Sequence, residues 1–214
     1  MKLNEILEEK FRLFSVNDFI RPVYYNFPIA LRFEIGIGNV WLNENPYEDK
    51  NLVLNNDYCK IANQRALKIY SSVFEPSDDI LLVFDCNPDK RLKISLSEIS
   101  IKQRIRVVQP LNEVDGDDCP YSYYRYLYKL KASKLPAKIL LNNIITAELG
   151  GESRYSGSVF IYNLNSDLLF SIYDDRGADL IATEKETLKP IYTKLNGMLL
   201  KYDREQMDKV FSVK

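Results

Sequence analysis

The sequence predicts an α+β protein: a mainly antiparallel sheet with helices packed on it, and a C-terminal β-meander followed by helices. Three β-rich runs, 158–164, 168–173 and 179–182, are separated only by short turns at 165–167 and 174–177, which is typical of an antiparallel meander. The helical patterns do not alternate one-for-one with the strands, as they do in a doubly wound parallel sheet.

Apolar residues at helical spacing predict a first helix over residues 3–14. A strand follows over 29–37, in which apolar residues alternate with small or charged ones. Arg32 and Glu34 therefore share the polar face of this strand. If a helix covers that face, both charges need partners, because an unpaired buried charge is costly.

The next helix begins at Asp57, which can act as its N-cap, and ends before Pro76. Residues 80–84 are apolar at every position, which predicts a strand buried on both faces and therefore inside the sheet. The stretch 89–106 is basic and is interpreted as a solvated face, with a strand near 105–108.

Residues 123–130 alternate as another strand, and a helix is predicted over 136–149. After the meander, Thr183 and Glu186 have the spacing of a capping box, which predicts that a helix begins there. A last helix is expected over 204–211.

The composition limits the function classes. The 214 residues are 46% hydrophobic and 28% charged, with a net charge of −1, which excludes a disordered chain and gives no general attraction to nucleic acid. A chain of this size can bury about 70% of its unfolded surface. The absence of histidine excludes Ser-His-Asp and Cys-His relays and histidine-based metal sites. We expect a single α+β domain over 1–214, with 113–120 as a weak point.

Neither a membrane span nor a secretory signal is expected. The acidic residues Glu5, Glu8 and Glu9 fall where the apolar part of a signal peptide would begin, and no apolar run approaches the length of a membrane span. The three cysteines are far apart and form no Cys-x-x-Cys pair, so neither a disulfide framework nor a structural zinc site is expected. The sequence therefore predicts a cytoplasmic protein.

Three carboxylates, Asp174, Asp175 and Asp179, lie within six residues at a predicted hairpin. Such a group could hold a hard divalent cation. Arg176 in their midst already supplies the compensating charge, and the spacing does not match a calcium loop. We therefore favour a turn in which Arg176 pairs with a carboxylate, and we expect no metal and no cofactor.

Two further groups are candidates for a site. Arg32 and Glu34 are expected to form a partly solvated ion pair, joined by Arg65 from the neighbouring helix; the alternative is a polar cleft shared with the hairpin. Tyr124 and Tyr126 lie beside arginine and lysine on one predicted strand. Strand packing is the first interpretation of these tyrosines, contact with a protein the second and stacking on nucleic acid a distant third.

Four segments, 31–36, 65–66, 173–182 and 202–204, together with Phe74 and Tyr192, resemble a bacterial domain-of-unknown-function family numbered thirty-eight eighty-five, found mainly in Gram-positive bacteria. The resemblance covers residues 24–211, and the Asp-Asp-Arg-Gly-x-Asp block is its most specific part. It implies a bacterial cytosolic protein, and it supplies no activity and no catalytic residues.

The first hypothesis is a non-catalytic module that binds another protein, with an immunity factor that neutralises a toxin as one form. The alternative is a magnesium-dependent phosphoester hydrolase that uses the hairpin carboxylates and Glu34. Membrane contact is not expected and nucleic acid is an unlikely partner. The candidate binding residues are Arg32, Glu34, Arg65, Tyr124, Tyr126, Asp174, Asp175, Arg176 and Asp179.

Overall fold

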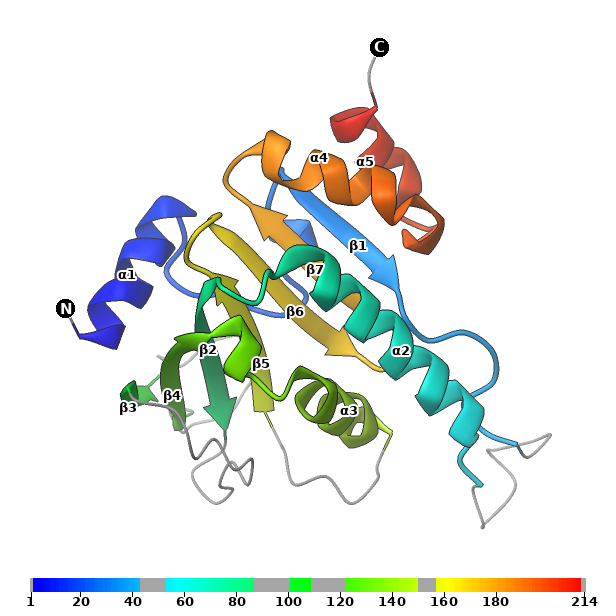
Figure 1. Cartoon of the computed structure of the whole chain (residues 1–214), viewed down its shortest axis with the longest axis horizontal. Helices are drawn as coiled ribbons and strands as arrows, with labels where there is room; N and C mark the ends of the chain where they lie inside the picture. The colour runs from blue at the N-terminus through cyan, green and yellow to red at the C-terminus, as the bar shows by residue number, and fades with distance from the viewer. Residues whose placement is uncertain (1, 43–52, 87–100, 109–121, 150–156, 213–214) are drawn as a thin grey trace, which may run out of the picture.

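A computed structural model describes residues 2–42, 53–86, 101–108, 122–149 and 157–212. Within these residues seven strands form one antiparallel sheet in the order β1-β7-β6-β5-β2-β4-β3 (Figure 1). This confirms the predicted fold class and the C-terminal meander. The strands are β1 (Ala30–Glu34), β2 (Asp79–Cys86), β3 (Ile101–Val108), β4 (Ser122–Lys131), β5 (Gly157–Asn163), β6 (Leu168–Asp174) and β7 (Gly177–Ala182).

Helices cover both faces of the sheet. On one face, Tyr70 of α2 and Phe74, which follows this helix, pack against Phe170 of β6, and α3 lies beside α2 (Figure 1). On the other face, Phe19, which follows α1, packs against Phe160 of β5. The helices are α1 (Leu3–Leu13), α2 (Asn56–Val73), α3 (Ala137–Glu148), α4 (Lys185–Lys194) and α5 (Arg204–Phe211), with short 3₁₀ turns η1 (Tyr24–Asn26), η2 (Ala132–Lys134) and η3 (Asn196–Met198).

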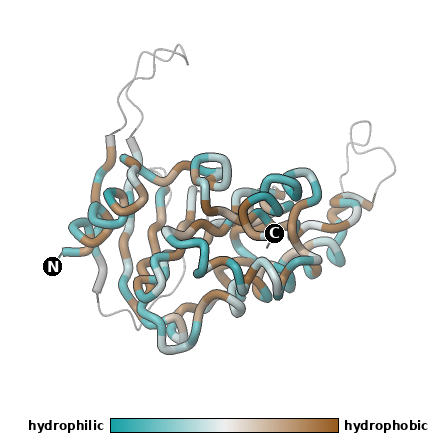
Figure 2. Tube along the Cα trace, turned by 90° about the horizontal axis from the view of Figure 1, so that it is seen from above, coloured by the Kyte–Doolittle hydropathy of each residue, from teal (hydrophilic) through white to brown (hydrophobic). Residues whose placement is uncertain are grey.

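The core follows the inner strands. Residues 80–84 of β2 are almost completely buried, and β2 lies between β5 and β4, so the predicted inner strand is confirmed. The tube in Figure 2 shows hydrophobic residues along the strands and hydrophilic residues on the outer turns of the helices. Burial of this apolar surface is the main favourable term in folding.

Several boundaries differ from the predicted ones. The N-cap of α2 is Asn55, whose side-chain oxygen accepts from the backbone N–H groups of Asp57 and Tyr58, so the expected cap at Asp57 is wrong. Asp57 instead places its charge in the first helical turn, where the helix dipole favours it. The capping box at Thr183 is also wrong, because α4 begins at Lys185 with no side-chain cap.

The first strand is paired along both of its edges. Its inner edge pairs with β7, and on the other edge Phe33 forms a bridge with Leu199. The backbone N–H of Leu200 also donates to the carbonyl of Arg32 at 2.9 Å. Segments from the last fifth of the chain therefore hold β1 on both sides.

Among the described residues, no helix is long and apolar enough to cross a membrane. The predicted weak point at 113–120 lies outside the described residues, as does Cys119. The single-domain organisation stays a prediction.

Candidate functional site

In the hairpin between β6 and β7, the carboxylate of Asp174 is paired with Arg176 of the same hairpin. Asp174 accepts from the backbone N–H and from Nε of Arg176, both at 2.8 Å, and also pairs with its Nη2. The Arg176 side chain remains 74% exposed. This is the arrangement expected of a turn in which arginine pairs with a carboxylate, and it fixes the direction of an exposed guanidinium.

The second hairpin carboxylate is bound by α2. The hydroxyl of Tyr58 donates to Asp175 at 2.5 Å. The pKa of Tyr58 is raised well above its usual range, mainly by burial and secondly by this hydrogen bond. The carbonyl of Arg176 accepts from the backbone N–H groups of Ile35 and Gly36 at 2.7 and 3.1 Å. A Cβ at Gly36 would lie 2.1 Å from the Tyr58 hydroxyl oxygen, so only glycine fits there without rearrangement. The hairpin is thus tied to α2 and to the end of β1.

The third hairpin carboxylate belongs to a buried cluster. Asp179 is completely buried, and its carboxylate accepts from Nε of Arg32 at 2.9 Å and from the backbone N–H of Tyr24 at 3.1 Å. Nη1 of Arg32 lies 3.5 Å from Asp203, which precedes α5. The expected pair between Arg32 and Glu34 is therefore wrong, because the β1–β7 register places Arg32 directly opposite Asp179.

Arg65 binds main chain and not a carboxylate. Its Nε and Nη2 donate to the carbonyl of Glu34 at 2.9 and 2.7 Å. Arg65 reaches the end of β1 from α2, whereas the side chain of Arg32 lies on the opposite face, which the N-terminal segment covers. The expected joint cluster of Arg32, Glu34 and Arg65 is therefore wrong.

Three tyrosine rings surround the Arg32 guanidinium. The ring centroids of Tyr25, Tyr173 and Tyr24 lie 4.4, 4.3 and 5.3 Å from its central carbon. These distances are those of cation–π contacts. Tyr25 is 56% exposed, so one side of the stack faces solvent.

Tyr202 extends the aromatic surface. It is 87% exposed and directly precedes Asp203, whose carboxylate accepts from the Tyr25 hydroxyl at 3.4 Å. Sequence reasoning missed these tyrosines as site residues, although the Tyr24-Tyr25 doublet and the Tyr202-Asp203-Arg204 run were available signals. We call the surface formed by Tyr25, Tyr173, Arg176 and Tyr202 the tyrosine–arginine patch.

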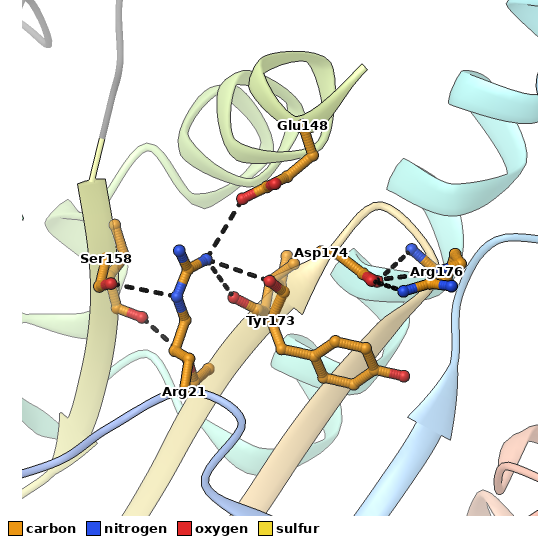
Figure 3. Close-up of polar contacts among 9 residues, drawn as sticks. Arg21, Glu148, Ser158, Tyr173, Asp174 and Arg176 are labelled. Carbon is orange, nitrogen blue, oxygen red and sulfur yellow. Dashed lines mark hydrogen bonds and ion pairs between the residues drawn. The ribbon is translucent and has the colours of Figure 1, made fainter. Parts of the chain in front are cut away.

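A short N-terminal segment, residues 18–25, crosses the Phe160 face of the sheet and ends at Tyr25 of this patch, and we call it the strap. Figure 3 shows Arg21 of the strap between β5, the end of β6 and Glu148 of α3. Its Nε donates to Ser158 at 3.1 Å, and its Nη1 donates to the carbonyls of Ile172 and Tyr173 at 3.3 and 3.2 Å. With Tyr24 bound to Asp179, the strap is fixed to β5, β6 and β7.

A second buried charge cluster fixes the start of the strap to β4. Arg125 is 4% exposed, and its Nε and Nη2 each donate to Asp85 at 2.7 Å. Nη2 also donates to both oxygens of Asp18, at 2.9 and 3.0 Å, and to the Tyr123 hydroxyl. Burial raises the pKa of Asp85 despite this pairing.

The candidate tyrosines of β4 do not join the hairpin. Tyr124 and Tyr126 are half-buried; Tyr124 contacts Arg104 and Tyr126 packs near Phe84. Strand β4 is four strands from β7 in the sheet, which is about 19 Å at the usual strand spacing. These contacts agree with strand packing, the first interpretation.

The carboxylates proposed as metal ligands have separate partners. Asp174 binds Arg176, Asp175 binds Tyr58 and Asp179 binds Arg32. Among the described residues, no group of three or more acidic or cysteine side chains is placed to hold a metal ion. A magnesium site requires such oxygens to converge on one point, so this geometry does not favour the hydrolase alternative.

Comparison with known proteins identifies the family. A family model described as a domain of unknown function, DUF3885, matches residues 3–203. The chain belongs to the DUF3885 family. This confirms the resemblance drawn from the hairpin block and the neighbouring segments.

One relative aligns with nearly the whole chain. The uncharacterized protein YnaE of Bacillus subtilis (strain 168) is 25% identical over 220 residues, which cover 94% of this chain and 99% of that protein. No solved structure matches the chain.

The buried carboxylate of Asp179 predicts a pH dependence of stability. Burial raises its pKa to about 6, although the hydrogen bond from Arg32 opposes the rise. An unfolded aspartate titrates near 3.9. Between about pH 4 and 6 the folded protein therefore holds a proton that the unfolded chain has released, so this contribution to stability is complete below pH 4 and is lost as the pH rises through 6. The loss is on the order of 2–3 kcal/mol.

Urea unfolding of the wild type and of Asp179→Asn between pH 4 and 7 measures this effect. Asparagine cannot ionise but can still accept from Tyr24. The advantage of the wild type over the variant should shrink by that amount as the pH rises, since other titrating groups are common to both. Parallel pH profiles for the two proteins would contradict the prediction.

Proposed function

We propose that this DUF3885 protein is a non-catalytic binding module whose partner is another protein, and that the tyrosine–arginine patch is its contact surface. The observation that carries the proposal is that two exposed side chains are held in place, since Tyr25 stacks on the buried Arg32 and Arg176 pairs with Asp174. Tyrosine and arginine are enriched at the centres of protein interfaces, where a few residues dominate the affinity.

Support for a preformed surface comes from the contacts beneath the patch. Arg176 is fixed by Asp174, and the Tyr25 and Tyr173 rings stack on Arg32, which is itself bound to Asp179. Side chains that are ordered before binding lose less entropy when a partner arrives. A rigid patch of this kind suits tight binding without catalysis.

The chemistry of the patch indicates which side chains a complementary partner surface would present. The tyrosine rings offer apolar area, and Arg176 offers guanidinium N–H groups to solvent. A complementary surface would present apolar side chains with a carboxylate opposite Arg176. An immunity-type role, in which the protein blocks a toxin by covering it, needs only such a surface, and it is the form of the function that we favour.

The proposal predicts a one-to-one complex with a protein from the organism that encodes the chain. The partner would be captured on immobilised wild type, purified, and titrated against wild type and single variants Tyr25→Ala, Arg176→Ala and Tyr202→Ala. Loss of a central interface residue costs about 2 kcal/mol or more, so at least one variant should weaken binding about 30-fold.

Leu13→Ala on α1 and Arg106→Ala on β3 are matched controls, because both side chains are exposed and lie outside the patch. They should bind as tightly as the wild type. A partner that binds all three patch variants with unchanged affinity would overturn the assignment of the patch, and the absence of any stoichiometric partner would overturn the proposed function.

A further inference from the structure

A groove between α2 and α3 is separate from the patch. Its volume is about 720 Å³, within the range of small-molecule sites. The two helices lie side by side on the Phe170 face of the sheet (Figure 1). The lining side chains recur at helical spacing on both helices and include Cys59, Lys60 and Asn63 from α2 and Lys138, Ile139 and Asn142 from α3.

Asn63 is the unusual member of this lining. It is only 9% exposed, yet its side-chain amide has no hydrogen bond or other polar contact within the part of the chain that the structure describes. Buried amides are nearly always hydrogen-bonded, because an unmet donor or acceptor costs stability. A buried amide that lines a groove and lacks an internal partner is placed to bind a ligand.

The charged side chains that line the groove are both positive. Lys60 of α2 and Lys138 of α3 both line the groove, both are exposed, and the lining contains no acidic residue. Neither lysine forms an ion pair within the described residues. Two positive charges match a phosphate monoester, which carries a charge of about −1.5 to −2 at neutral pH.

The groove also offers an apolar surface. Ile139 is 59% exposed, which is high for a large aliphatic side chain. An aliphatic side chain beside an amide suits a planar heterocycle, whose face packs on the apolar group while its edge pairs with the amide. Asparagine pairs with a base edge that displays a donor next to an acceptor, as adenine does.

We infer that the groove between α2 and α3 binds a nucleoside monophosphate, with the phosphate between Lys60 and Lys138 and the base edge on Asn63. The base would rest on Ile139. This site differs from the glycine-rich phosphate loops, because side chains and not backbone N–H groups bind the phosphate. It is independent of the proposed protein-binding patch.

Isothermal titration of the full chain with the four common nucleoside monophosphates tests this inference. At least one should bind with one-to-one stoichiometry, and inorganic phosphate or the matching nucleoside should bind at least about tenfold more weakly, because each supplies half of the contacts. Lys60→Gln and Lys138→Gln should each weaken the nucleotide about tenfold and leave the nucleoside unchanged. Binding of none of the four would overturn the inference.

Asn63 gives a test that does not depend on the choice of nucleotide. Asn63→Leu removes an amide without a partner, so the melting temperature should rise by about 2–4 °C while nucleotide binding is lost. Asn142→Leu, at an exposed amide of the same groove, should leave the melting temperature unchanged. If leucine does not fit, Asn63→Ala should still fold and lose binding. A folded Asn63 variant that binds nucleotide as the wild type does would contradict the assignment.

The rate of alkylation of Cys59 can show whether the ligand binds in the groove. It lines the groove and is partly exposed, whereas Cys86 is 2% exposed. In a Cys119→Ser background, bound nucleotide should slow alkylation of Cys59 at least several-fold. Unchanged alkylation at saturating nucleotide would place the ligand elsewhere and overturn the inference. Tyr25→Ala and Arg176→Ala should bind nucleotide normally, which separates a failure here from a failure of the proposed function.

Discussion

Replacement of Arg125 by leucine is expected to lower the free energy of unfolding by about 3–5 kcal/mol. Arg125 is almost completely buried, and its guanidinium is the shared donor to Asp85 and Asp18. Without it, two carboxylates lie close together with no positive charge between them. Leaving one side of a buried ion pair without its partner is among the most destabilising single changes.

Urea denaturation at pH 7 measures this loss, and Arg106→Leu is the matched control. Arg106 lies on the neighbouring strand β3 and is exposed, so its replacement should change the unfolding free energy by less than about 0.5 kcal/mol. The double variant Arg125→Leu/Asp85→Leu should recover part of the loss, because an apolar pair replaces an unpaired charge. An Arg125→Leu protein as stable as the control would show that the cluster contributes little.

Replacement of Arg32 by methionine is expected to cost a similar amount, about 3–5 kcal/mol at pH 8. Methionine keeps the long stem, but Asp179 and Asp203 lose their shared cation, and both are buried. The loss should be smaller at pH 5, because Asp179 already has a raised pKa and would bind a proton in place of Arg32.

Replacement of Arg32 by methionine should also weaken binding at the tyrosine–arginine patch. The Tyr25 and Tyr173 rings stack on Arg32, so the variant should bind the partner protein more weakly than its residual stability alone explains. Arg176→Ala is the control for stability, since an exposed ion pair contributes about 0–1 kcal/mol. Equal unfolding free energies for Arg32→Met and wild type at pH 8 would contradict the role of Arg32 in the cluster.

Local signals predicted most of the secondary structure. The last helix was expected over residues 204–211 and is observed there, because its apolar residues repeat at helical spacing. The meander followed from β-rich runs separated by short turns. Strand β3 was harder to define, because Lys102, Gln103 and Arg104 are consecutive polar residues and interrupt its alternation. The α2 cap was misplaced by two residues because asparagine and aspartate both suit that position.

The candidate site could be predicted only in part. The pair of Asp174 and Arg176 depends on two residues within one turn, so sequence reasoning found it. The partner of Arg32 depends on which strand pairs with β1, and that strand lies 147 residues further along the chain. Periodicity assigns a residue to a face of its own strand and carries no information on sheet order. The roles of Tyr25 and Tyr202 were missed for the same reason.

The pairing of β1 has a consequence for synthesis on the ribosome. As the polypeptide emerges, β1 is made early, but its neighbours β7 and residues 199–200 leave the exit tunnel more than 140 residues later. Until then both edges of β1 are open. Pairing of β1 should therefore be a late step in the folding of nascent DUF3885 chains.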